Sequence, residues 1–229
     1  MTISRNEVAA TVLAGKPTAP QPFFQAFAPV NIALCKYWGK RQHELNTPLN
    51  DSLSITLPET GSTTRISRQP TAADRDRVVF NGQSLQPGDP MHDRILAHVE
   101  LFRSYAPGYF LIETDNDVAT GAGLASSASG FAALTRALAG VAGIALSERE
   151  LSILSRLGSG SACRSISNGF GRWHRGERVD GMDSFATFYS WRWPQLRVGV
   201  LTVAKERKPV GSREGMARTV QHSTLYQVG

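Results

Sequence analysis

The feature that most constrains the fold is a glycine-containing loop between a strand-like segment and a helix-like segment. The stretch GYFLIET (108–114) is typical of a strand, and the loop DNDVATGAG (115–123) follows it. From Ser126 onwards, apolar residues recur on one helical face at Phe131, Leu134, Leu138 and Val141. A chain with this order has to place the start of a helix close to the end of a strand.

Such a junction has the chemistry of an anion site. The first turn of a helix presents backbone N–H groups without intrahelical partners, together with the positive end of the helix dipole. Gly121 and Gly123 allow the backbone to approach a phosphate closely, and Ser126 or Ser127 can add a hydroxyl or help to hold a metal. A glycine loop whose serines only cap the helix is the alternative, and the loop alone does not separate the two.

Two well-known phosphate loops are excluded by the residues present. A Walker A loop needs a lysine after its second glycine, and none occurs here. The dinucleotide-binding pattern of a Rossmann fold fails at its third position, which is Ser126. The acidic residue expected further on falls within Ser147–Glu150, which has the pattern of a helix start.

Charge and cysteine content narrow the possible partners. The net charge is +6 and the isoelectric point is near 9.7, which suits anionic partners, including phosphorylated metabolites. The basic residues are scattered, and Glu206 interrupts the longest cluster, so we expect no nucleic-acid partner. The two cysteines form neither a disulfide framework nor a zinc motif. The N-terminus lacks an apolar signal region and no run reaches roughly 18 apolar residues, so we expect a cytoplasmic protein that binds no membrane.

The order of the remaining elements indicates an α+β fold. Residues 1–20 end in a proline-rich stretch and are predicted to be a loosely ordered extension, 21–210 a single ligand-binding domain, and 211–229 the start of a further domain. Strands are predicted at 23–36, 52–57 and 196–203, a hairpin at Asn81-Gly82, and helices at 93–105, 147–158 and, after a turn, within 211–223.

Two further segments carry chemistry. The first is APVNIALCKYWGK (28–40), a strand that brings two lysines and a phenol to one strand end, and it continues to LNTPLNDSLS (45–54). A strand end with solvated lysines is the alternative. The second is LGSGSACRS (157–165), in which backbone N–H groups and hydroxyls face an anion and Arg164 offers a planar fork for carboxylate or phosphate. A flexible linker is the alternative there, although DGMDS (180–184) follows.

Together these segments resemble the diphosphomevalonate decarboxylases of the GHMP kinase superfamily, over roughly residues 24–227. The 28–54 string matches the opening motif of that family, the 121–129 loop is similar to its ATP loop, and GSGSACR and DGxDS also match. The resemblance implies a GHMP-kinase-type N-terminal domain (ribosomal protein S5 domain 2-like). It also implies ATP and Mg²⁺ as cofactors and mevalonate 5-diphosphate as the small-molecule substrate, and it allows a homodimer.

The resemblance also assigns roles to residues. Lys36 and Arg164 would be catalytic, with Lys36 at the reacting centre and Arg164 on the substrate carboxylate. The substrate would contact Tyr37, Trp38, Gly39, Lys40, Asn46, Arg94, Ser159, Gly160, Ser161, Ala162, Cys163, Ser212 and Arg213. ATP would contact Gly121, Gly123, Leu124, Ala125, Ser126 and Ser127, with Ser127 also at the metal.

The resemblance implies ATP-dependent conversion of mevalonate 5-diphosphate to isopentenyl diphosphate, CO2, ADP and phosphate. The family continues beyond Gly229 into a second domain that supplies the aspartate acting on the 3-hydroxyl, so the chain is expected to be C-terminally truncated and to expose an apolar face. A mevalonate 3-kinase, a phosphomevalonate decarboxylase and an inactive nucleotide-binding remnant stay open as alternatives. Arg94 and Arg213 favour the diphosphate substrate.

Overall fold

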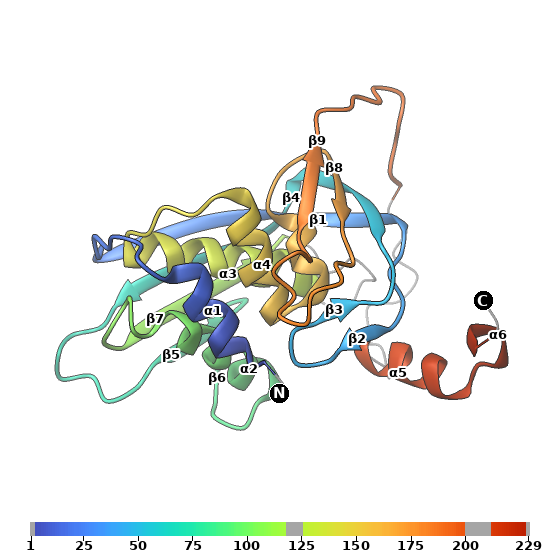
Figure 1. The fold of residues 1–229 in the computed structure, drawn as a ribbon. Helices are drawn as coiled ribbons and strands as arrows, with labels where there is room; N and C mark the ends of the chain where they lie inside the picture. Colours follow the sequence, from blue (N-terminus) through green and yellow to red (C-terminus); the bar gives the residue numbers. More distant parts are fainter. Residues whose placement is uncertain (1–2, 118–125, 200–211, 228–229) are drawn as a thin grey trace.

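The structure is a computed structural model, and it describes residues 3–117, 126–199 and 212–227 (Figure 1). The strands are β1 (Phe23–Cys35), β2 (Lys40–Gln42), β3 (Thr47–Pro48), β4 (Ser52–Arg68), β5 (Arg77–Phe80), β6 (Gln83–Leu85), β7 (Phe110–Asn116), β8 (Phe170–Trp173) and β9 (Ala186–Tyr189). The helices are α1 (Arg5–Leu13), α2 (Pro90–Val99), α3 (Ser126–Ala142), α4 (Glu148–Gly158), α5 (Ser212–His222) and α6 (Thr224–Gln227), with 3-10 helices η1 (Glu100–Phe102) and η2 (Gly160–Ser165). This mixture confirms the predicted α+β class.

Strand β4 joins the main sheet together. On one edge, β1 runs antiparallel along nearly its whole length, from Phe23 opposite Ser67 to Cys35 opposite Leu53. On the other edge, β4 pairs first with β8 and then with β7, both antiparallel. The order is β6-β5-β7-β4-β8-β9, with β1 also on β4. The start of β4, the end of β1 and β8 therefore meet at one end of the sheet.

The pairing of β1 and β4 shifts in register near the place where β4 changes its neighbour on the other edge. The register shifts between Pro29 and Val30, and Gly61 lies opposite Pro29. A Cβ atom at Gly61 would lie 2.1 Å from the carbonyl oxygen of Ala28. Any larger residue would push the two backbones apart, so this position requires glycine. Gly61 lies between the β4 residues that pair with β8 and those that pair with β7.

Helix α3 packs against β1 and β4, with α4 beside it (Figure 1). Most residues of α3 are buried, and a Cβ atom at Gly140 would lie 2.2 Å from the ring of Phe24. Glycine at this position therefore lets β1 approach the helix closely. Near the start of α3, the hydroxyl oxygens of Ser129 and Ser62 lie 2.7 Å apart. That contact fixes the first turn of α3 to the middle of β4.

The N-terminal segment is ordered, and the prediction of a loosely held extension is wrong for residues 5–13. Ser4 begins α1 with a capping box, in which its side chain and that of Glu7 exchange hydrogen bonds with each other's backbone N–H. Four residues of α1 belong to the hydrophobic core, namely Val8, Ala9, Val12 and Leu13. These apolar contacts hold a segment whose proline-rich continuation (17–22) suggested disorder.

Most of the other predicted elements are confirmed. The hairpin turn between β5 and β6 has φ 48° at Asn81 and 74° at Gly82, as a type I′ turn requires. The predicted capping box begins α4, with Ser147 accepting from the backbone N–H of Glu150. Helix α2 begins before the predicted Asp93, because the Asp89 side chain caps it and Pro90 fits its first turn.

In the C-terminal part, one predicted element is wrong and another is confirmed. The prediction of a buried strand over 196–203 is wrong for the described residues 196–199, which pair with no described strand and leave Val198 40% exposed. A strand needs a hydrogen-bonded neighbour, and a pattern of apolar residues does not supply one. Residues 212–222 form α5, as predicted, and beyond it the Tyr226 hydroxyl donates to the carbonyl oxygen of Trp38 at 2.8 Å. The domain boundary at 211 stays a prediction.

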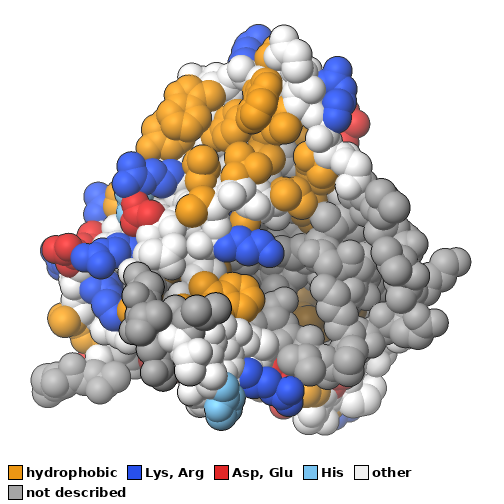
Figure 2. All heavy atoms as spheres, turned by 90° about the vertical axis from the view of Figure 1, so that its right-hand side faces the viewer, with side chains coloured by type: hydrophobic (Ala, Val, Ile, Leu, Met, Phe, Trp, Pro, Cys, Tyr) orange, Lys and Arg blue, Asp and Glu red, His pale blue; other side chains and the backbone are white. Residues whose placement is uncertain are grey.

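Several large apolar side chains are exposed to solvent. Large examples are Leu34, Trp191 and Trp193, which are 48%, 58% and 57% exposed. The ring of Trp191 stacks on that of Tyr189 at 4.2 Å. Figure 2 shows hydrophobic side chains gathered on the upper part of the face that it presents. None of the helices in the described ranges is long and apolar enough to cross a bilayer.

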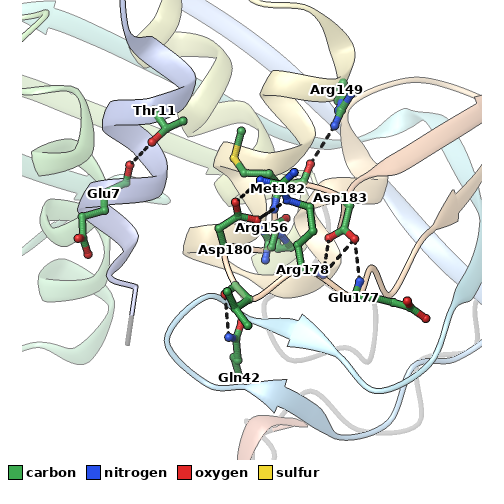
Figure 3. A network of polar contacts seen from close by, with 12 residues as sticks. Glu7, Thr11, Gln42, Arg149, Arg156, Glu177, Arg178, Asp180, Met182 and Asp183 are labelled. Atoms are coloured by element: carbon green, nitrogen blue, oxygen red, sulfur yellow. Dashed lines mark hydrogen bonds and ion pairs between the residues drawn. The ribbon is translucent and has the colours of Figure 1, made fainter. Parts of the chain in front are cut away.

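The segment 177–183, which we call the 177–183 loop, is held through its carbonyl oxygens (Figure 3). The donors are side chains of Arg41 and Gln42 in β2 and of Arg149 and Arg156 in α4. The acceptors are the carbonyl oxygens of Glu177, Arg178, Val179, Gly181 and Met182. The loop is thus tied both to the β2–β3 hairpin and to α4.

Arg156 is the central donor of this arrangement. It is fully buried, and it donates to the carbonyl oxygens of Leu45 at 2.6 Å and of Gly181 at 2.9 Å. Burial lowers the pKa of the guanidinium to about 10, so Arg156 stays charged at neutral pH. One side chain therefore joins α4, the 177–183 loop and the residue that precedes Asn46.

Replacing Arg156 is expected to destabilise the fold. In Arg156→Met, two buried carbonyl oxygens lose a charged donor, and the free energy of unfolding should fall by about 3 kcal/mol. The exposed Arg149→Met variant loses one carbonyl contact at the surface and should cost less than about 1 kcal/mol. Urea denaturation of both variants tests this, and equal losses would show that Arg156 has no special structural role.

Helix α2 carries a buried histidine that the sequence does not single out. His98 is 0% exposed, its Nε2 lies 2.8 Å from the hydroxyl of Thr135, and its ring is edge-on to that of Phe131 at 5.4 Å. Burial, followed by the positive charges of Arg5 and Arg94, lowers the pKa of His98 to about 3. His98 is therefore neutral in the folded protein at neutral pH.

This pKa predicts an acid-sensitive fold. An unfolded histidine has a pKa of about 6.5, so below that pH the unfolded chain binds a proton that the folded chain excludes. The contribution of His98 to the free energy of unfolding is fully present above about pH 6.5. Below that pH, this contribution falls by about 1.4 kcal/mol per pH unit. In His98→Gln, the free energy of unfolding should fall less steeply between about pH 6 and 4 than in the wild type. Unfolding free energies measured across that range check it, and parallel curves would contradict it.

Candidate active site

Two of the segments singled out in the sequence meet at Gly160. A Cβ atom at Gly160 would lie 3.1 Å from both the Tyr37 hydroxyl and the Trp173 ring, and 3.6 Å from the Asn46 carbonyl oxygen. The rings of Tyr37 and Trp173 meet edge to face at 4.7 Å. The GSGS segment therefore lies directly against the strand end that carries the YWGK sequence.

Arg164 lies in η2, behind this contact, and is only 2% exposed. Its guanidinium donates to the hydroxyls of Ser52 and Ser54 and to the side-chain oxygen of Asn31 at 3.3 Å. The Tyr37 and Trp173 rings lie 5.9 and 5.7 Å from its central carbon. Asn31 is held in turn, because its amide nitrogen donates to the Ser165 hydroxyl at 2.8 Å.

All the acceptors of Arg164 are neutral. Within the described ranges, no ion pair includes this residue. Burial lowers the pKa of its guanidinium, as expected for a cation removed from water without a counter-ion. A buried guanidinium with neutral partners is suited to receive an anion.

The sequence reasoning did not assign Asn31, Ser52 or Ser54. All three lie within the quoted motifs, and Ser52 and Ser54 share one face of β4. The period-two spacing was the available signal, but only the pairing of β4 with β1 and with β8 shows that this face points to Arg164.

Lys36 follows the last residue of β1, and its side chain is exposed. The next turn of chain is held by Asn50, whose amide nitrogen donates to the Lys36 carbonyl oxygen at 3.1 Å and whose amide oxygen accepts from the Trp38 backbone at 3.2 Å. Gly39 has φ 90°, and a Cβ there would lie 2.2 Å from the Tyr226 hydroxyl oxygen. This position therefore requires glycine.

Lys40 and Asn46 form the next part of the site. The Lys40 ammonium donates to the Asn46 side-chain oxygen at 2.6 Å, and the Asn46 amide nitrogen donates to the Arg156 and Leu157 carbonyl oxygens at 3.0 and 3.2 Å. These two residues line a cavity of about 410 Å³ together with Arg94. We call it the basic cavity, and its ionisable lining residues are Arg5, Lys40, His43, Glu44, Asp93 and Arg94.

The nucleotide part of the site is only partly described. Gly121, Gly123, Leu124 and Ala125 lie outside the described residues, whereas Ser126 and Ser127 are the first residues of α3. The hydroxyl oxygens of Ser127 and Ser159 are 3.5 Å apart. The two segments predicted to bind ATP and substrate therefore touch at this point.

The start of α3 fits a magnesium–nucleotide complex. Its first turn contains no acidic residue, so none of the residues of that turn places a carboxylate at the positive end of the 17-residue helix. Within the described ranges, no group of three or more His, Cys, Asp or Glu side chains could hold a metal. Since Mg²⁺ usually binds through phosphate oxygens, waters and few protein oxygens, the Ser127 hydroxyl is a suitable contact.

The remaining predicted residues lie in different surroundings. Ala162 and Cys163 are 0% exposed as whole residues, so the structure presents neither of them at the surface of the site. Burial raises the pKa of the Cys163 thiol to about 12, which excludes a thiolate at neutral pH. Ser161 accepts a hydrogen bond from Asn31 through its carbonyl oxygen at 3.2 Å. Ser212 and Arg213 begin α5, but their side chains lie outside the described part.

Comparisons with known proteins show the family of the chain. Residues 28–186 match the family model described as the diphosphomevalonate decarboxylase-like N-terminal domain. The diphosphomevalonate decarboxylase of Rattus norvegicus is 43% identical over 219 residues, which are 87% of this chain and 53% of that protein. The corresponding values for the Saccharomyces cerevisiae protein are 38% over 214 residues, 87% and 54%.

Solved structures give the same result. Mevalonate diphosphate decarboxylase from Staphylococcus aureus matches with a TM-score of 0.76 and 34% identity, over 90% of this chain and 62% of that one. A structure described as MDDEF in complex with MVAPP, AMPPCP and magnesium matches with a TM-score of 0.73 and 35% identity, over 90% and 63%. The chain thus spans about half the length of the curated relatives it matches. Because the family model matches well over half of its residues, the chain belongs to the diphosphomevalonate decarboxylase-like family, whose N-terminal domain it contains.

Proposed function

We propose that this chain supplies the substrate-binding wall and the nucleotide-binding loop for ATP-dependent decarboxylation of mevalonate 5-diphosphate to isopentenyl diphosphate. The observation that carries the proposal is Arg164, a guanidinium that is 2% exposed and hydrogen-bonded only to neutral groups in the described part. Burying such a charge without an anion is costly. A substrate carboxylate would supply that anion and match the planar fork of the guanidinium.

The reaction needs three kinds of group, and the site offers candidates for each. Arg164 would orient the carboxylate until it leaves as CO2, and the ring of Tyr37 would shield that contact from water. Lys36, exposed at the end of β1, would stand at the 3-hydroxyl or the transferred phosphoryl group. Ser159 and Ser161 would donate hydrogen bonds to substrate oxygens, and Tyr37 to Lys40 and Asn46 would shape the pocket.

The nucleotide would bind at the start of α3. ATP and its Mg²⁺ would supply the phosphoryl group that makes the tertiary hydroxyl a leaving group. Ser126 and Ser127 would hold phosphate and metal, and Gly121 and Gly123 would be the loop residues beside them. The 3.5 Å separation of the Ser127 and Ser159 hydroxyls supports the proposal, because phosphoryl transfer needs the two ligands in contact.

The description of one matched structure, a complex with MVAPP, AMPPCP and magnesium, supports the proposed ligands. A mevalonate 3-kinase, a phosphomevalonate decarboxylase and a nucleotide-binding remnant are the alternatives. The cavity that holds Lys40 and Arg94 favours a diphosphate. The cytoplasmic location and a homodimer stay predictions from the sequence.

The test is to incubate the protein with MgATP and mevalonate 5-diphosphate and to follow ADP, CO2 and phosphate. Equal amounts of all three products are expected for the decarboxylase. ADP formation without free phosphate or CO2 would favour the kinase, because the transferred phosphoryl group stays on the substrate. ATP binding without any product would favour the remnant. Replacing the substrate with mevalonate 5-phosphate identifies the phosphomevalonate decarboxylase, which would release CO2 at least as fast from the monophosphate.

Replacement of Arg164 should weaken substrate binding and leave nucleotide binding intact. Arg164→Gln removes a charge-assisted pair worth about 1.5–3 kcal/mol, so the affinity for mevalonate 5-diphosphate should fall about 10- to 150-fold. Titration calorimetry with mevalonate 5-diphosphate, and separately with MgATP, measures both. The matched control is Arg172→Gln, an exposed arginine on β8 that pairs with Asp51. Wild-type affinity in Arg164→Gln would remove the basis of the proposal.

A further inference from the structure

One residue that lines the basic cavity lies outside the region that the family model matches. Arg5, the first residue of α1, lines it beside Lys40 and Arg94, whereas the matched region begins only at residue 28. Its volume of about 410 Å³ lies within the usual range of ligand sites, about 300–1,000 Å³. Helix α1 therefore adds a guanidinium to a cavity that already contains three residues expected to bind substrate, Lys40, Asn46 and Arg94.

The position of Arg5 is well determined by α1. The capping box fixes the start of the helix, and the buried residues Val8, Ala9, Val12 and Leu13 fix its packing. After its C-terminal end, Lys16 pairs with Glu150 of α4 at 2.7 Å. The helix therefore presents the Arg5 side chain to the cavity as part of the folded core and not as a free tail.

The present partner of Arg5 can be exchanged for a ligand. Its Nε donates to the Glu44 carboxylate at 3.2 Å, and the two side chains are 34% and 49% exposed. Exposed ion pairs of this kind contribute little to stability. Among the described residues, the two terminal guanidinium nitrogens of Arg5 have no hydrogen-bond acceptor, so the fork is available to an anion with two or more oxygens.

The other charges in the cavity favour an anionic ligand. The carboxylate of Asp93 is occupied, because it accepts from the backbone N–H of Gly88 at 3.2 Å and lies 2.8 Å from Nδ1 of His92. The carboxylate of Glu44 lies in the pair with Arg5. Three cations, from Arg5, Lys40 and Arg94, thus face only two carboxylates, which leaves an excess of positive charge in the cavity.

The cavity also lies at the right end of the site for a diphosphate. Gly158 lines the cavity, the GSGS segment starts there, and that segment runs on to Arg164. A substrate with a carboxylate at one end and a diphosphate at the other would lie along this segment. We propose that Arg5 is a further substrate-binding residue, which binds the terminal phosphate of the substrate together with Lys40 and Arg94. This inference rests on the proposed function, since it takes the diphosphate substrate from it.

The test compares the two halves of the Arg5–Glu44 pair. Both Arg5→Gln and Glu44→Gln break the ion pair, but only the first removes a phosphate ligand. Arg5→Gln should weaken binding of mevalonate 5-diphosphate and of inorganic diphosphate about tenfold or more. Glu44→Gln should bind both equally well or more tightly, because a competing carboxylate is lost. Arg5→Lys should fall between wild type and Arg5→Gln, since it keeps the charge without the fork.

Titration calorimetry on the whole 229-residue chain gives these affinities, and thermal unfolding shows that each variant folds. Lys16→Gln is the matched control, because it removes another cation and ion pair near α1 outside the cavity, and its affinity should equal that of wild type. The loss in Arg5→Gln should also be larger for mevalonate 5-diphosphate than for mevalonate 5-phosphate.

Two results would overturn the inference and leave the proposed function standing. One is an equal loss in Arg5→Gln and Glu44→Gln, which would mean that the pair only ties α1 to the β2–β3 hairpin. The other is unchanged diphosphate affinity in Arg5→Gln. Conversely, Arg5-dependent binding of inorganic diphosphate by a protein that does not bind mevalonate 5-diphosphate would support the anion site and contradict the proposed function.

Discussion

The antiparallel pairing of β1 with β4 is the constraint on which the rest of the structure depends. It places Asn31, Ser52 and Ser54 around Arg164 at one end of the sheet. In the middle of β4, Ser62 contacts Ser129 and so fixes the start of α3. The separation between the buried guanidinium and the helix start is therefore set by the length of one strand. Because backbone hydrogen bonds define that length, the two parts of the site keep their spacing whatever the loops between them do.

Two buried arginines show how the partners of a structural charge differ from those of a charge proposed to bind substrate. Arg156 donates to two carbonyl oxygens of distant segments, and its role is to hold the chain together. Arg164 donates to side chains on β1 and β4 that hold it in place. Burial lowers the pKa of both, and both stay charged at neutral pH. The difference lies in what surrounds them, since Arg164 has the Tyr37 and Trp173 rings and the GSGS segment beside it, where a substrate would lie.

Local signals predicted local structure well. The Asn81-Gly82 turn and the Ser147 capping box depend on a few neighbouring residues, and both are confirmed. Features that depend on distant residues could not be predicted. The contacts of Ser52 and Ser54 with Arg164 need the strand pairing, and the ordered α1 depends on burial against a core that the sequence does not display. The apolar run at 196–199 shows the converse, because its pattern favours a strand but no described strand pairs with it.

The 177–183 loop has a consequence for the order in which the parts of the protein fold. The hydrogen bonds from Arg41 to this loop connect residues 136 and 137 positions apart in the chain, and Arg156 connects α4 to Leu45 across 111 positions. Contacts of such long range form late, because the chain has to close a large loop before it gains them. During synthesis, the β2–β3 hairpin that carries Lys40 therefore lacks its final supports until the ribosome has released residue 183. Lys40 is translated early, but it would be among the last residues of the proposed site to reach its final position.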